Sequence, residues 1–142
     1  MTILRILEFP DPKLRIKAIP IETVDDSLRV MIDNMFDTMY EALGIGLAAT
    51  QVDFHKRLLV ADVSSEKDDP YVLINPRILE KDGSKVSEEG CLSVPGYFDS
   101  VKRAETVRVS FLDRDGNQQE EEMTGMLAVC VQHEIDHLDG KL

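Results

Sequence analysis

Residues 125–138 read GMLAVCVQHEIDHL, and this stretch decides how the chain folds. Its first part, residues 127–131, is apolar at every position, which is typical of a helix buried on nearly all sides. Asp139 and Gly140 follow it and predict the end of the helix. Such a helix would carry its two histidines, His133 and His137, into the interior of the protein.

The polar part of this helix is an HExxH motif, His133-Glu134-Ile135-Asp136-His137. Residues four positions apart lie one turn apart on the same face of a helix, so both imidazoles can bind one metal ion. Glu134 lies beside His133 and can act as a general base on water that the metal activates. The alternative is an exposed polar helix end, but only roughly one chain in a few hundred of this length would contain HExxH by accident. We therefore predict a metal site.

A catalytic metal site needs three protein ligands and an open position for water. Only five residues follow His137, which excludes the extended HExxHxxGxxH pattern and a ligand from a following helix. The third ligand should lie upstream, where the candidates are Cys91, Cys130, His55 and the carboxylates. Cys91 is favoured because it lies in a glycine-containing loop, residues 88–93, that can approach the helix from a second direction. Cys130 is better explained as a small core residue, and His55 as a surface loop residue.

The composition is that of an ordinary globular protein, with 142 residues of which 43% are hydrophobic and 30% charged. We expect one domain over residues 1–142. No apolar run approaches the roughly 18 residues of a membrane-spanning helix, and residues 1–12 lack a secretory leader pattern. The formal net charge of −11 opposes binding to nucleic acid and to anionic membranes, so neither is expected as a partner. Two cysteines without an export signal indicate a reducing cytoplasm.

The remaining periodicities predict an α+β fold, in which antiparallel strands pack around the buried C-terminal helix. Residues 25–43 have a methionine-rich stripe at helical spacing, with Thr23 or Asp25 as the cap and Gly44 or Gly46 as the stop. Short strands are predicted at 57–63, 71–74, 77–80, 105–112 and 118–123.

Residues 44–49, GIGLAA, formally match a dinucleotide-binding fingerprint. That fingerprint requires a strand before it and a helix after it, whereas here a helix precedes it and a strand follows. We reject the nucleotide interpretation. Two glycines still indicate either a close approach of the backbone to a substrate or a tightly packed turn.

Three motifs occur in an order and spacing that resembles the peptide deformylase family: Gly44-x-Gly46-Leu-Ala-Ala-x-Gln51, Glu89-Gly90-Cys91-Leu92-Ser93 and Gln132-His133-Glu134-x-x-His137. The resemblance extends over essentially the whole chain. It implies hydrolysis of the N-formyl group of N-formylmethionyl nascent peptides, with release of formate. The residue roles it implies are Cys91, His133 and His137 as metal ligands, Glu134 as acid and base, Gln51 and the Leu92 amide as the oxyanion hole, and Ile45 and Gly46 as the peptide-binding strand.

The apolar residues Met126, Val129 and Cys130, together with Ile45, could line a pocket for the methionine side chain. Coordination by two histidines and one cysteine tolerates Fe(II), Zn, Ni or Co, and the resemblance favours one Fe(II) per chain. A bacterial cytoplasm, or that of the bacterial host of a virus, is expected rather than an organelle. The competing functions are an amidase for other small N-acyl groups and a non-catalytic metal-binding protein. Glu134 and Gln51, which are not ligands, argue against the second.

Two features depart from the pattern of most bacterial members of that family. Those members continue into a further C-terminal helix beyond the position of Leu142, so this chain resembles a short form, and stable docking on the ribosome is doubtful without that helix. Ser87 also stands where many relatives have an aliphatic residue lining the side-chain pocket. The pocket should therefore differ in shape, while the reaction stays the same.

Overall fold

The computed structural model describes residues 2–141, and its secondary structure consists mainly of two helices and seven strands. In chain order these are α1 Asp26–Glu41, β1 Gly46–Ala48, β2 Leu58–Ala61, β3 Tyr71–Asp82, β4 Lys85–Cys91, β5 Val94–Arg103, β6 Thr106–Leu112, β7 Gln118–Thr124 and α2 Gly125–Leu138, with short 3-10 turns at Pro12–Arg15 and Ala49–Val52. Strands β1, β2, β3, β6 and β7 form one antiparallel sheet in that order, and β4 and β5 form a separate hairpin.

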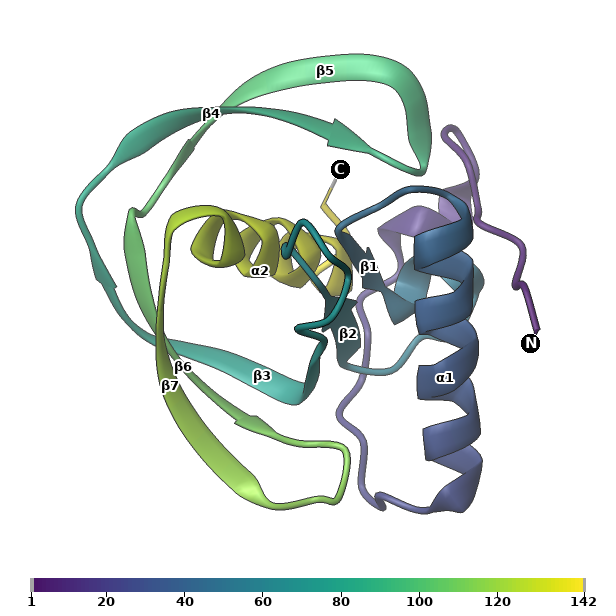
Figure 1. Cartoon of the computed structure of the whole chain (residues 1–142). Helices are drawn as coiled ribbons and strands as arrows, with labels where there is room; N and C mark the ends of the chain where they lie inside the picture. The colour runs from purple at the N-terminus through teal and green to yellow at the C-terminus, as the bar shows by residue number, and fades with distance from the viewer. Residues whose placement is uncertain (1, 142) are drawn as a thin grey trace.

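The helix predicted at 125–138 is the centre of the fold. Figure 1 shows α2 enclosed by the curved five-stranded sheet and the β4–β5 hairpin, with α1 on the far side of β1 and β2. Ala128, Val131 and Leu138 on α2 are fully buried and pack into one hydrophobic cluster with the sheet. The helix ends at Leu138, and Gly140 follows with a positive φ of 79°. The predicted α+β class and the buried C-terminal helix are both confirmed.

Strand β2 is buried along its whole length because it is covered on both faces. All four of its residues, Leu58–Ala61, have an exposed fraction of 0%. Leu58 and Val60 pack towards α1, whereas Leu59 and Ala61 pack towards α2. A strand between two helices therefore has a continuous apolar sequence, while β6 alternates between buried and partly buried residues, as predicted.

Helix α1 begins where the sequence predicted a cap. The Asp25 carboxylate accepts a hydrogen bond of 2.9 Å from the Leu28 amide. Its methionine-rich stripe is core, since Ile32, Met35 and Met39 are fully buried against β1 and β2. Within the described residues, neither helix has the length and apolar content needed to cross a membrane.

Several details of the sequence-based fold were wrong or missing, among them strand β5 at Val94–Arg103, which was not predicted. The two strands predicted at 71–74 and 77–80 are one strand, β3, whose pairing with β6 shifts register between Ile74 and Arg77. The predicted loop at 88–93 is mostly strand, because β4 continues to Cys91. Strand β1 was not predicted, since three residues are too few to show a periodicity.

The burial of α1 predicts a large difference between two positions on the same helix. Ile32→Ala should lower the free energy of unfolding by about 2–5 kcal/mol, because it removes a fully buried side chain and leaves a cavity. Val30→Ala is the matched control: Val30 is 60% exposed, and its replacement should change stability by less than about 0.5 kcal/mol. Urea unfolding of both variants measures the difference, and equal losses would contradict this packing.

Candidate metal centre

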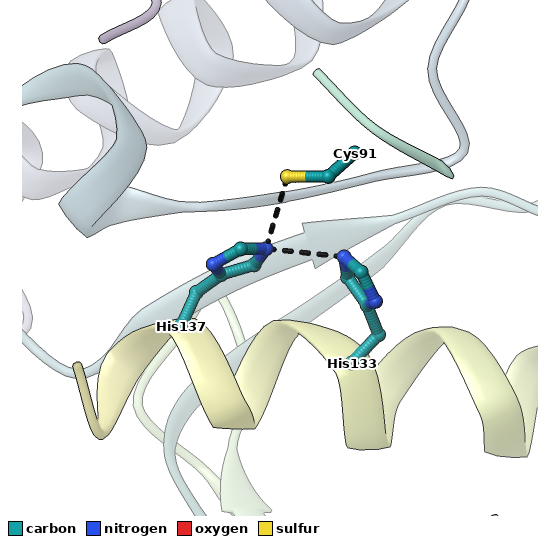
Figure 2. Close-up of side chains that lie close together, drawn as sticks. All are labelled: Cys91, His133 and His137. Atoms are coloured by element: carbon teal, nitrogen blue, oxygen red, sulfur yellow. Dashed lines mark hydrogen bonds between the residues drawn. The ribbon is translucent and has the colours of Figure 1, made fainter. Parts of the chain in front are cut away.

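The two histidines of the HExxH motif face each other on consecutive turns of α2. Their Nε2 atoms are 3.0 Å apart, and the ring planes are inclined by 75° (Figure 2). His137 is 2% exposed, whereas His133 is only partly buried. The apolar run before the motif explains this placement, because it buries the helix that carries both rings.

Cys91 supplies a third donor atom from a different element, the end of β4. Its Sγ lies 3.3 Å from His137 Nε2 (Figure 2), and the donor atoms of Cys91, His133 and His137 all lie within 4.8 Å of one another. Tetrahedral zinc coordination would separate two histidine nitrogens by about 3.3 Å and a nitrogen and a sulfur by about 3.6 Å. The observed contacts are within a few tenths of an ångström of these values, so the three side chains fit one divalent metal ion.

The Cys91 sulfur is in the chemical form that binds metals. Burial by itself raises the pKa of the thiol, but hydrogen bonds from His133 and His137 lower it to about 6. Conversely, burial alone would lower the pKa of His133, and the adjacent Cys91, Glu134 and Glu89 raise it to about 9. A thiolate therefore stands beside the two imidazoles near neutral pH, as a soft metal ligand must.

Glu89 holds His133 from behind, a contact that sequence analysis missed. Its Oε1 lies 2.8 Å from His133 Nδ1, so Nδ1 keeps its proton and Nε2 is the nitrogen at which a metal ion would replace a proton. Two hydrogen bonds of 3.0 and 2.8 Å from Arg103 fix the Glu89 carboxylate. Arg103 also donates to Asp136 of α2 at 2.6 Å. These contacts tie the hairpin to the helix, and strand alternation places Glu89 on the same face as Cys91.

Glu134 lies beside the ligands without being one of them. It is 5% exposed, and its Oε1 has no hydrogen-bond partner within residues 2–141. Burial raises the pKa of this carboxyl, although the positive charges of His133 and His137 oppose that rise. His137 Nε2 lies 4.0 Å from Glu134 Oε1. A buried carboxylate oxygen without a hydrogen bond costs free energy, and it is available to take a proton.

Gly46 lies against this carboxylate. A Cβ at Gly46 would lie 2.5 Å from Glu134 Oε2 and 2.5 Å from Cys130 Sγ. Backbone and carboxylate are therefore in direct contact, which explains the glycine by close approach rather than by its conformation.

Gln51 lies behind Cys91 and is held at both ends. Its Oε1 accepts a hydrogen bond of 2.9 Å from the Ala48 amide, and its Nε2 donates to Ser93 Oγ at 3.0 Å and to Cys91 Sγ at 3.6 Å. Leu92 directly follows Cys91, and its side chain packs against Gly44. Both residues thus lie next to the ligand set.

A cavity of about 510 Å³ opens beside the ligands, between the 43–46 loop, the hairpin and α2. All five residues predicted to bind substrate line it, namely Ile45, Gly46, Met126, Val129 and Cys130, together with Cys91, Leu92, His133 and Glu134. The hairpin adds further lining residues that sequence analysis did not assign to substrate binding, among them Tyr97, Phe98 and Pro95. Ser87 lines the cavity as well.

The other candidate ligands lie apart from this centre. His55 pairs with Asp53 at 2.7 Å on the surface. Cys130 is 4% exposed, and its Sγ lies 3.5 Å from the Ile45 carbonyl oxygen. These positions agree with the interpretation of Cys130 as a core residue and of His55 as a surface residue. Among the described residues, no other cluster of histidine, cysteine and carboxylate donors converges in this way.

Three ligands from a helix and a strand, a buried glutamate beside them and an apolar cavity together define a metal-dependent hydrolase. The sequence profile described as polypeptide deformylase matches residues 3–142. The chain belongs to the polypeptide deformylase family, which confirms the resemblance found in its three motifs.

Relatives agree in sequence and in structure. A peptide deformylase of Stenotrophomonas maltophilia is 60% identical over 145 residues, covering 100% of this chain and 85% of that protein. The crystal structure of a peptide deformylase from Legionella pneumophila superimposes with a TM-score of 0.96 at 52% identity, covering 99% of this chain and 83% of that one. A probable peptide deformylase from Synechococcus phage S-SSM7 gives a TM-score of 0.93 at 37% identity, covering 98% and 96%.

The Glu89–His133 contact predicts an effect on metal affinity. Glu89→Gln should weaken zinc binding by about 10–100-fold, because an amide holds the His133 ring less firmly than a carboxylate. Glu88→Gln is the control, since Glu88 is exposed and has no such contact in the described structure. Competition with a chromogenic chelator measures both affinities, and an equal change in the two variants would refute the role of Glu89.

Proposed function

We propose that this chain hydrolyses the N-formyl group of N-formylmethionyl nascent peptides, releasing formate and a free amino terminus. The observation that carries the proposal is the convergence of Cys91, His133 and His137 beside Glu134 at one wall of an apolar cavity, in a chain of the deformylase family. The buried Glu134 carboxylate, whose Oε1 has no hydrogen bond within residues 2–141, favours catalysis over simple metal storage, which would not need it.

Cys91, His133 and His137 would hold one divalent ion per chain. When bound, that ion supplies a Lewis acid that makes water acidic and polarises the formyl carbonyl. The mixed set of one thiolate and two imidazoles suits Fe(II), Zn, Ni or Co, and Fe(II) is proposed as the physiological ion.

Glu134 is proposed to move the proton. It takes the proton of the attacking water and delivers it to the amine nitrogen as the carbon–nitrogen bond breaks. The carbon–oxygen bond formed in the same reaction gives formate. The raised pKa of this buried carboxyl supports the role, because a base whose pKa lies closer to neutrality can both accept and return a proton.

Gln51 and the Leu92 amide are proposed to stabilise the oxyanion. The Gln51 carboxamide oxygen is occupied by the Ala48 amide, so its NH₂ group is turned towards Cys91 and Ser93. A donor held in place before the reaction costs no reorganisation when negative charge develops.

Ile45 and Gly46 are proposed to bind the peptide backbone. Strand β1 is at one end of the sheet and pairs only with β2, so its other edge can accept an extended peptide as a further strand. Met126, Val129 and Cys130 would surround the methionine side chain. Their apolar surface suits an unbranched thioether.

The partners and location follow from the same features. Formylated nascent peptides are the proposed substrates, and the net charge of −11 opposes direct binding to nucleic acid or to anionic lipid. Relatives from bacteria and from a bacterial virus support a bacterial cytoplasm as the place of action. Cys91 and Cys130 are not joined by a disulfide, which is consistent with a reducing compartment.

The test of the proposal is formate release from formyl-Met-Ala-Ser by the iron- or zinc-loaded protein. Acetyl-Met-Ala-Ser should be a much poorer substrate, and this comparison separates a deformylase from a general amidase. Formyl-Asp-Ala-Ser should also show a sharply lower kcat/KM, because a carboxylate has no partner in the apolar pocket. No formate from the formyl-Met peptide would refute the function.

Glu134→Gln should keep about one metal ion per chain yet lower kcat by about 10²–10⁴-fold, since the amide cannot accept the proton. Metal analysis and formate release from the same preparation give the two values. Turnover near that of the unmodified protein, with metal bound, would contradict the proposed role of Glu134.

The two cysteines should respond oppositely to the same substitution. Cys91→Ser should lose the metal and the activity, because a hydroxyl stays protonated near neutral pH and only two strong ligands remain. Cys130→Ser should keep the metal and lose about 1–3 kcal/mol of stability through burial of a hydroxyl. Metal content of the two purified variants decides between them, and the reverse pattern would show that the ligand set is wrong.

A further inference from the structure

Asp62 is a fully buried carboxylate that has no part in the reaction above. It directly follows β2, and its exposed fraction is 0%. None of the ion pairs formed within residues 2–141 includes it. Instead, Oδ2 accepts a hydrogen bond of 2.6 Å from Tyr40 Oη, and Oδ1 accepts hydrogen bonds from the amide and hydroxyl of Ser64. A buried charge held only by hydrogen bonds costs free energy, so its placement calls for a physical reason.

The backbone of Asp62 is also hydrogen-bonded to the 43–46 loop. Its amide donates a 2.8 Å hydrogen bond to the Ile45 carbonyl oxygen. Tyr40 lies in the last turn of α1, five residues before Ile45. The Tyr40–Asp62 side-chain bond and the Asp62–Ile45 backbone bond therefore close a ring around residues 40–45.

The loop inside this ring has little packing of its own. Leu43 is 87% exposed and has a positive φ of 59°, which is unfavourable for leucine. Ile45 is 38% exposed. Since burial of its side chains does not hold the loop, hydrogen bonds at its two ends must hold it. At one end the Gly44 amide donates a hydrogen bond to the Met39 carbonyl oxygen of α1. At the other end the Ile45 carbonyl oxygen accepts one from the Asp62 amide.

We propose that Tyr40 and Asp62 are positioning residues, which hold the 43–46 loop at the place where the peptide backbone binds. The assignment rests on the proposed function, because it takes Ile45 and Gly46 as the peptide-binding residues. Neither Tyr40 nor Asp62 lines the cavity, whereas Leu43, Gly44, Ile45 and Gly46 all do. The pair thus acts on peptide binding through the loop. Gly46, which touches Glu134, is also held by its pairing with Ala61 of β2, so kcat should change little.

Tyr40→Phe tests the proposal, because it removes one hydroxyl and keeps the ring that stacks on Phe36. In hydrogen exchange, the Gly44 and Asp62 amides should exchange at least about tenfold faster. Without the Tyr40–Asp62 hydrogen bond the loop opens more often, and both amides belong to the hydrogen bonds at its ends. In kinetics, KM for formyl-Met-Ala-Ser should rise about five- to tenfold, while kcat stays within about twofold. N-formylmethionine, which has no second residue to pair with the loop, should show no such rise in KM.

Two further variants separate positioning from general stability. Asp62→Asn keeps an acceptor for Ser64 and an amide group for Tyr40, so exchange and KM should stay close to those of the unmodified protein. Val107→Ala removes part of a fully buried side chain of β6 and destabilises the core. It should leave KM unchanged, and the Gly44 and Asp62 amides should exchange no faster relative to the other amides of the chain.

The proposal is overturned if Tyr40→Phe changes neither exchange nor KM, or if Val107→Ala changes both by the same factors. If the unmodified protein released no formate, the proposed function would fail, while the exchange measurement would still decide whether Tyr40 and Asp62 hold the loop.

Discussion

The structure depends on one constraint, the burial of a helix that carries two histidines and a glutamate. Polar side chains inside a protein need partners, and the rest of the fold supplies them around α2. The sheet covers its apolar residues, the hairpin brings Cys91 and Glu89 to the histidines, and the 43–46 loop closes over Glu134. A cavity of about 510 Å³ remains where the substrate is proposed to bind. The order of elements therefore follows from what this helix requires on each side.

Hydrogen bonds within the protein orient the polar side chains of the metal centre before any substrate binds. His133 is fixed by Glu89, and Gln51 is fixed by the Ala48 amide and Ser93. The contact with Glu89 uses Nδ1 of His133 and leaves Nε2 facing the other ligands, and the contacts of Gln51 place its Nε2 3.6 Å from Cys91 Sγ. Such preorganisation is the main way in which a protein stabilises developing charge. Glu134 differs, because one of its oxygens is left unpaired, as suits a group that must gain and lose a proton.

The sequence was informative where periodicity or motif spacing was strong. The apolar run in α2, the methionine stripe of α1 and the alternation in β6 each predicted the observed element. The three residues whose donor atoms converge, Cys91, His133 and His137, were also predicted, from the HExxH spacing and from the glycine beside Cys91. Sequence analysis missed Glu89, since the segment before Cys91 was taken as a loop; a loop gives no rule for which side chains share a face. The hydrogen bond between Tyr40 and Asp62 could not be predicted either, because these residues are 22 positions apart in the sequence.

The β4–β5 hairpin is hydrogen-bonded within itself and is not a strand pair of the main sheet. Its inner face carries Cys91 and Glu89, whereas Tyr97 and Phe98 lie exposed near its turn and line the cavity. Tyr97 and Phe98 thus line the cavity without belonging to either hydrophobic cluster of the core. Mutations near this turn can alter which peptides are preferred without disturbing the packing around α2. The hairpin thus combines two residues that support the metal site, Cys91 and Glu89, with exposed positions such as Tyr97 and Phe98, whose replacement would leave both of them in place.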